Sequence, residues 1–322
     1  MFCARLVVSH DSGSPPANII AAVFLCARIA TSDDVEIMLR LCRPPNRFSE
    51  ADRERARRLW DRLWKVARLE GIVMEDLQPE GPPQAVGILV AAVVVPELHD
   101  LLVSENGPDA VDGLAEVSEK EGLSPLNEET LGRANATEGI DRIFLWLGYQ
   151  NEVEHSESTA SLRSRVVNAH LDMFVGNRTR RMTIEAEEGA VLRRFLGYGY
   201  LPIRERAGKT VLSLHRDAAL QGTDLMSQRL FSYDPPVLAF TAAQRDILLL
   251  ARQGYTDQEI AATLGKSPDS VKKRWAGIYA RFAQVFPGRL PASGEGSRGA
   301  EKRRTLLSYL RDRPEELRPY RP

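Results

Sequence analysis

Small and cationic side chains share one face of a predicted helix near the C-terminal end of the chain. Within this helix, Val271, Trp275, Ile278 and Phe282 recur at i, i+4, i+7 and i+11 and form an apolar stripe that should face a core. The opposite face and its flanks then carry Lys272, Lys273, Ala276, Gly277 and Arg281. Such a face fits the chemistry of a DNA major groove, because bulky side chains would hold the helix away from the bases. The alternative interpretation is a solvated basic helix in an ordinary bundle.

Three consecutive helices with clear start signals would position this face. Thr241 with Gln244 and Thr256 with Glu259 form capping boxes, and Ser267 precedes a proline at the first helical position. Glycines follow the first two helices at 254 and 265, where a left-handed residue lets the chain reverse. The pattern predicts a helix-turn-helix between Val237 and Phe286.

This segment resembles the DNA-binding domain of LuxR-type regulators, which are also called GerE-like. The matching elements include Phe240-Thr241, Gly254, Glu259-Ile260-Ala261, Leu264-Gly265 and Ser270-Val271-Lys272. The resemblance implies that Lys272, Lys273 and Ala276 read bases. It also implies backbone contacts from Thr256, Lys266, Ser267, Arg274 and Arg281. Two positions depart from the family pattern: Ala242 stands where the family has proline, and Arg274 stands where it usually has histidine.

Charge is unevenly distributed along the chain. The 322 residues carry a net charge of −1, but the segment from Val237 to Pro322 holds 16 Lys and Arg against 9 Asp and Glu, and is therefore net +7. The preceding residues are net −8. A cationic segment on an acidic body is typical of a DNA-binding module attached to another domain, although a solvated basic tail would give the same count.

The residues after the helix-turn-helix also depart from the family pattern. A LuxR-type domain turns at once into a short fourth helix that mediates dimer contacts, whereas here Pro287-Gly288 and the segment from Pro291 to Gly299 intervene. A helix is expected from Glu301 to Arg311, with Leu306, Leu307 and Leu310 on one side. Residues 287–322 therefore form a linker and a C-terminal helix, which is either a displaced fourth helix or a basic tail.

The residues before the helix-turn-helix, 1–230, predict an α/β domain. Its first half should contain a strand at Leu6–Val8, a buried helix at Ile19–Ile29, a helix capped by Ser49 and Asp52 and running to Leu69, and a buried strand at Ala85–Pro96. The polar stretch Glu105–Gly139 is expected to be loop with one short helix. Its second half should alternate strands and helices: Ile143–Leu147, Ser161–Phe174, Arg181–Ala186, Glu187–Leu196, Leu201–Glu205 and Thr210–His215.

This second half resembles the C-terminal half of GNAT-type acetyltransferases, because a strand and a helix lead through Gly197-Tyr198-Gly199-Tyr200 into a strand pair. The resemblance implies a glycine-rich turn after a long strand, whose N–H groups would bind the pyrophosphate of acetyl-CoA. The strand Ala85–Val95 is followed instead by Pro96-Glu97-Leu98-His99-Asp100. We therefore expect a sensor or dimerisation platform that is not an enzyme and uses no cofactor.

No other motif in the sequence indicates a catalytic or metal-binding site. The five histidines are scattered without a metal-ligand spacing, and Ser12 and Ser14 lack the strand and helix of a nucleophile elbow, so no catalytic or metal-binding residue is assigned. Three cysteines at 3, 26 and 42 fit a reducing cytoplasm. The longest apolar run, Ala85–Pro96, is too short to cross a membrane as a helix.

The sequence as a whole thus predicts a cytoplasmic transcriptional regulator of the LuxR family with an α/β N-terminal domain and an all-α DNA-binding domain. Its expected partners are double-stranded DNA and a second copy of the chain, since single helix-turn-helix units usually work as dimers. RNA polymerase and an unidentified small-molecule effector are further candidate partners. Two alternatives stay open: a GNAT-like acetyltransferase with an appended DNA-binding module, and a sigma-factor-like promoter-recognition protein.

Overall fold

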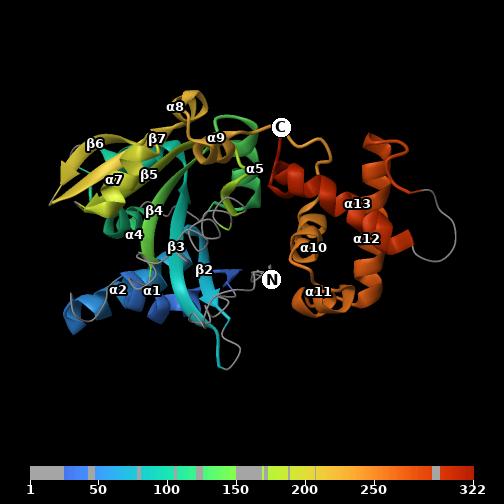
Figure 1. The fold of residues 1–322 in the computed structure, drawn as a ribbon, viewed down its shortest axis with the longest axis horizontal. Helices are drawn as coiled ribbons and strands as arrows, with labels where there is room; N and C mark the ends of the chain where they lie inside the picture. Colours follow the sequence, from blue (N-terminus) through green and yellow to red (C-terminus); the bar gives the residue numbers. More distant parts are fainter. Residues whose placement is uncertain are drawn as a thin grey trace, which may run out of the picture.

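The computed structural model of the chain describes residues 25–42, 48–77, 81–104, 107–120, 126–149, 169, 173–187, 189–206, 208–291 and 298–322. Within these residues, a mixed α/β sheet with flanking helices is followed by a group of helices at the C-terminal end (Figure 1). The expected strand at Leu6–Val8 and most of the expected helix at Ser161–Phe174 lie outside the described residues.

The sheet has seven described strands in the order β1-β2-β3-β4-β5-β7-β6. Their bounds are β1 Leu25–Ile29, β2 Arg68–Asp76, β3 Gln84–Val94, β4 Ile140–Tyr149, β5 Thr179–Glu187, β6 Leu201–Arg206 and β7 Lys209–His215. Neighbouring strands are antiparallel except β4 and β5, which pair in parallel.

Helices cover both faces of the sheet, which explains why β3 is apolar along almost its whole length. Ile88, Val90 and Ala92 point into a core beneath α1 (Val35–Cys42), α2 (Glu50–Val66), α3 (Pro96–Val103) and α4 (Ala110–Lys120). Leu89 and Ala91 point to the opposite core, which α7 (Ala190–Gly197), α8 (Arg216–Gln221) and α9 (Leu225–Phe231) help to close. A smaller cluster joins β3 and β4 to α5 (Glu128–Ala136).

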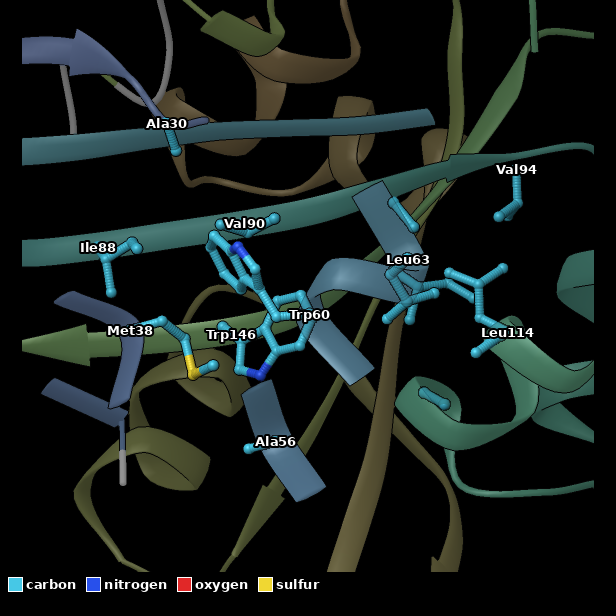
Figure 2. Packing of buried hydrophobic residues seen from close by; sticks show 14 of the residues in the cluster. Ala30, Met38, Ala56, Trp60, Leu63, Ile88, Val90, Val94, Leu114 and Trp146 are labelled. Carbon is cyan, nitrogen blue, oxygen red and sulfur yellow. The ribbon is translucent and has the colours of Figure 1, made fainter. Parts of the chain in front are cut away.

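Tryptophans fill the centre of the first core (Figure 2). Trp60 is fully buried, its ring centroid lies 4.9 Å from that of Trp146 on β4, and its Nε1 donates a 2.7 Å hydrogen bond to the Ser32 carbonyl. Ser49 and Asp52 form the expected capping box of α2. Trp60 is thus a core residue, and Trp64 of the same helix packs partly buried against this core.

Two sequence predictions are wrong in this domain. Residues 25–29, expected as part of a buried helix, form strand β1, because a short apolar run has no periodicity that separates strand from helix. The stretch 105–139, expected as loop with one short helix, contains both α4 and α5. Gly113 and Gly132 made these segments resemble loops in the sequence. Both glycines lie where other atoms of the chain leave no room for a side chain or only little.

The C-terminal helices form their own core. Helices α10 (Ala242–Arg252), α11 (Asp257–Thr263) and α12 (Pro268–Val285) bury Ile247, Ile260 and Trp275 together. Helix α13 (Arg298–Asp312) adds Leu306 and Leu310 to the same core, so it packs as a structural helix. None of the described helices is long and apolar enough to cross a membrane.

The last residues of the chain return to the sheet domain and lie beside α5 (Figure 1). The Arg321 N–H donates to the Gly132 carbonyl at 3.0 Å, and the Asn135 amide donates to the Pro319 carbonyl at 2.9 Å. Arg318 donates through Nε to the Val175 carbonyl at 3.0 Å and through Nη2 to the Met173 carbonyl at 2.5 Å. We call residues 313–322 the return segment, and its bonds tie the helical domain to the sheet domain.

Candidate functional site

The parallel pair β4 and β5 separates before either strand ends. Hydrogen-bonded pairing begins at Ile140 with Thr179 and ends at Phe144 with Ile184. Beyond this point β4 continues to Tyr149 paired with β3, and β5 continues to Glu187 paired with β7. Ligands of open sheets bind at the carboxyl ends of parallel strands, so this divergence is the natural place to look for a site.

A β-bulge in β4 marks the point of divergence. Val90 of β3 faces Trp146, whereas the next residue of β3, Ala91, faces Phe144, and Leu145 is therefore an extra residue without a partner. Bulges bend a strand and are common beside active sites. Among the described residues, no strand pairs with β4 beyond Phe144 on the β5 side. Unpaired backbone N–H and C=O groups on a strand edge can pair with an extended, amide-bearing molecule.

A pair of carboxylates lies at the same place on β5. Glu185 is the first residue of β5 after the parallel pairing ends, and its Oε1 accepts a 3.3 Å hydrogen bond from the N–H of Ala110 at the start of α4. Asp109 lies beside it and is 3.5 Å from the Lys209 ammonium on β7. The Glu185 side chain is 13% exposed and the Asp109 side chain 33%, so solvent reaches both groups.

The two carboxylates differ in their affinity for a proton. Burial, followed by the negative charge of Asp109, raises the pKa of Glu185. Burial also acts to raise the pKa of Asp109, but Lys209 and the N–H groups of Val111 and Asp112 outweigh it and hold that pKa below its usual range. When the pair carries one proton, Glu185 therefore holds it, and a carboxylate whose pKa is raised is a better proton acceptor than an ordinary one.

Arg204 on β6 fastens the loop that carries Asp109. Its guanidinium donates to the carbonyls of Leu102 at 3.3 Å, Gly107 at 3.3 Å and Pro108 at 3.4 Å, and to that of Ser104. It also lies 3.7 Å from Glu185 Oε1. Gly107 has no room for a side chain, because a Cβ would lie 2.6 Å from the Leu101 carbonyl oxygen. The connection between α3 and α4 is thus held against the carboxylate pair.

Deeper on the same face of β5, polar residues connect the strand to α3. Buried His99 shares a 2.8 Å hydrogen bond with Thr183, whose hydroxyl is 3.0 Å from that of Ser213 on β7. Fully buried Asp141 on β4 accepts from Arg181 Nη2 at 2.6 Å and from Arg180 Nη2 at 2.7 Å. The His99 bond connects α3 to the middle of β5, and the two arginines satisfy the buried Asp141 carboxylate.

The sequence analysis missed the carboxylate site. Met182 and Ile184 indicated a half-buried strand whose other face is polar and exposed, whereas α3 and α4 cover that polar face as well. The expected phosphate-binding turn was sought after β3, which has antiparallel neighbours on both sides. The strand with a parallel neighbour is β4. No pattern in the sequence pairs β4 with β5, because the contact joins segments far apart in the chain.

The predicted DNA-contacting residues lie at the N-cap of α11, in the turn between α11 and α12, or on α12. Lys266, Lys272, Lys273 and Ala276 are exposed, and Arg274 is half-buried. Thr256 and Ser267 are also exposed, but each side chain caps a helix by accepting from Glu259 N or Ser270 N. Arg281 is exposed and donates to the Leu238 carbonyl. The apolar stripe of α12 faces the core as expected, with Val271, Trp275, Ile278 and Phe282 buried.

Comparison with known proteins reaches only the sheet domain. No protein-family model matches the sequence, and no curated protein matches it. Among solved structures, FeeM, an N-acyl amino acid synthase from uncultured soil microbes, is 12% identical and covers 63% of this chain and 97% of its own, with a TM-score of 0.35. A spermidine N-acetyltransferase SpeG mutant from Vibrio cholerae is 9% identical over 62% and 98%, with a TM-score of 0.34.

The apo structure of FdhC, a nucleotide-linked sugar GNAT, is 10% identical over 60% of this chain and 88% of its own, with a TM-score of 0.32. The prediction that this chain is not an enzyme is wrong in the light of these GNAT and acyltransferase neighbours. Its basis was the absence of a glycine-rich turn after β3, whereas the neighbour that pairs in parallel with β5 is β4. At these identities the neighbours assign no substrate to this chain, and the proposals below are argued from the site itself.

Proposed function

We propose that the chain is an acyltransferase that moves an acyl group from a thioester to an amine at the divergence of β4 and β5. The observation that carries this proposal is the coincidence of three features: the end of the parallel pairing, the bulge at Leu145, and Glu185 one residue further on with its pKa raised by burial. A free strand edge and a poised carboxylate are what such a transfer needs, one to hold the donor and the other to accept a proton.

The free edge of β4 fits the donor's arm. Acetyl-CoA and related thioesters carry an extended chain with two amides, which can pair with a strand as a peptide does. Residues 150–168, which follow β4, contain no glycine and lie outside the described residues, so no group is assigned to the pyrophosphate. When bound, the thioester supplies an activated carbonyl carbon.

Glu185 would act on the acceptor. An ammonium ion approaching the carboxylate pair is attracted by its charge and loses a proton to Glu185. The free amine then attacks the carbonyl carbon, so that a C–N bond forms, the C–S bond breaks and the thiol leaves. Asp109 and Lys209 are positioning residues in this scheme, because Asp109 raises the pKa of Glu185 and Lys209 holds Asp109 in its charged form.

Release of free thiol from acetyl-CoA in the presence of a panel of primary amines tests the proposal. We expect turnover that saturates with acetyl-CoA, and a loss of about 10²- to 10⁴-fold in kcat/KM for Glu185→Gln. Glu205→Gln is the matched control, because Glu205 is an exposed carboxylate on the edge strand β6, beyond β7, and its replacement should leave kcat/KM unchanged. Absence of both thiol release and acetyl-CoA binding by calorimetry would overturn the proposal.

We propose a second function for the helical domain, namely binding to double-stranded DNA through a helix-turn-helix formed by α11 and α12. Gly265 takes the left-handed conformation at φ 60° in the turn between the two helices, and capped helix starts precede both. The exposed side chains here are cationic at Lys266, Lys272 and Lys273 and small at Ala276. Pairing of two chains on DNA half-sites would supply the specificity that one unit lacks.

A further inference from the structure

An arginine-lined groove lies away from both proposed sites. It has a volume of about 1630 Å³ and lies between the end of α9, the linker before α10, the end of α12 and the length of α13. The return segment closes one side through Glu315 and Glu316. Grooves between structural units are common ligand sites in proteins.

The groove has a large excess of positive charge. Seven of its described lining residues are arginines, against three carboxylates. One of these carboxylates, Glu316, is occupied internally, because it accepts from the N–H groups of Val237 and Leu238 at 3.1 and 2.9 Å and from the Tyr309 hydroxyl at 2.9 Å. Several cations therefore face the groove without an equivalent anion.

Three of these arginines have no carboxylate partner among the described residues: Arg229, Arg289 and Arg304. Arg229 and Arg304 are exposed to solvent, and the Arg289 guanidinium lies 5.3 Å from the centre of the Phe286 ring. Guanidinium groups recognise phosphate by paired N–H donors and by charge. An array of them in a concave surface fits a ligand with more than one phosphate.

Aromatic rings lie beside these arginines. Phe282, Phe286 and Tyr309 form a cluster whose ring centroids are 5.1 to 5.3 Å apart, and all three line the groove. Phe286 and Tyr309 are half-buried and thus keep part of their surface open. Aromatic faces bind planar bases by stacking, whereas a phosphate group without a base makes no such contact.

We infer that this groove is a binding site for a nucleoside polyphosphate, with the phosphates on the arginines and the base against Phe286 and Tyr309. The inference is independent of the proposed acyl transfer, since no lining residue belongs to the sheet or to the carboxylate pair. It assigns a ligand class to the junction between the two domains.

Calorimetric titration of the full chain with GTP and with inorganic tripolyphosphate, each without coenzyme A, tests the site. We expect Arg289→Gln together with Arg304→Gln to weaken binding of both probes at least tenfold. Phe286→Leu, which keeps the core apolar, should weaken GTP several-fold and leave tripolyphosphate unchanged. Arg193→Gln is the control, because Arg193 is an exposed arginine on α7 outside the groove.

Failure of GTP to bind the wild-type chain, or equal affinity in the double variant, would overturn the inference. The same double variant should also be titrated with duplex DNA. A loss of DNA affinity without any binding of GTP would show that the arginines extend a DNA interface, and this outcome also contradicts the nucleotide site.

Discussion

Burial changes the pKa of several titratable side chains in the sheet domain, and the Glu185–Asp109 pair is one example. Lys209 acts to lower the pKa of both Glu185 and Asp109, but together with the N–H groups of Val111 and Asp112 it outweighs burial only at Asp109. The Arg204 guanidinium donates hydrogen bonds to the backbone carbonyls of Leu102, Gly107 and Pro108. Its Nη2 lies 3.7 Å from Glu185 Oε1, which is too long for a hydrogen bond. Glu185 is consequently the carboxylate of the pair with the higher pKa, which is why the account gives it the proton-accepting role.

His99 makes stability depend on pH. Burial lowers the pKa of His99 to about 4 in the folded chain, from an ordinary value near 6.5, although Asp141 and Asp100 act in the opposite direction. The folded state therefore holds His99 neutral, whereas the unfolded chain gains a proton as the pH falls through 6.5. Stability due to this residue is complete above that pH and decreases by up to about 3 kcal/mol as the pH falls towards 4.

Urea unfolding at pH 7 and pH 5 measures this effect. We expect the wild-type chain to lose more stability between the two pH values than His99→Gln, which can still bond Thr183 but cannot titrate. The carboxylates of both chains contribute equally, so they cancel in the difference. Identical losses in the two chains would show that His99 is not kept neutral by burial.

Among the helices and strands, the sequence correctly predicted those whose ends and faces are determined by neighbouring residues in the chain. The capping residues of α2, α11 and α12 and the predicted strands at 181–186 and 210–215 correspond to the observed helices and to β5 and β7. The helices α4 and α5 were missed because Gly113 and Gly132 reduce helix propensity. The reason for Gly132 is non-local, because a Cβ there would lie 3.3 Å from the Arg321 nitrogen. The reason for Gly113 lies in the preceding loop, because a Cβ there would lie 2.2 Å from the side chain of Pro108.

The candidate site could not be predicted from the sequence for a related reason. It depends on the parallel pairing of β4 with β5 and on the cover that α3 and α4 give to the polar face of β5. Neither can be read from a window of neighbouring residues. The exposed cations of α12 depend only on helical periodicity, so their position on the surface could be predicted.

Helix α12 is the element on which the proposed DNA binding depends. We expect Lys272→Ala or Lys273→Ala to weaken binding to a selected duplex by about 1–3 kcal/mol without changing the circular dichroism spectrum, because both side chains are exposed. Gel-shift titration on a duplex obtained by in vitro selection gives the affinity, with Arg193→Ala as a cation control on α7. Unchanged affinity in the double lysine variant would remove α12 from the recognition role.

At the scale of the whole molecule, the return segment joins the two domains. Burial lowers the pKa of Arg318 to about 10, and its guanidinium supplies hydrogen bonds to the carbonyls of Met173 and Val175. Gly176, at φ 85°, leaves no room for a side chain, because a Cβ would lie 2.6 Å from the Glu315 nitrogen. The helical domain is thus held by specific contacts as well as by its covalent linker.

Arg318→Ala tests this connection. We expect it to cost about 1–3 kcal/mol, since two buried carbonyls lose their donor, and to make the helical domain melt separately from the sheet domain in calorimetry. Arg321→Ala is the control, because its ion pair with Glu129 is exposed and should contribute little. An unchanged single transition in Arg318→Ala would show that the return segment does not couple the domains.

The pH dependence of kcat/KM for acyl transfer reports the protonation of Glu185. We expect an acidic limb in the wild-type chain and its loss in Glu185→Gln. In Asp109→Asn the limb should move to lower pH, because removal of the neighbouring charge lowers the pKa of Glu185. The same limb in all three chains would contradict the assignment of proton transfer to Glu185 and, with it, the placement of the active site at the divergence of β4 and β5.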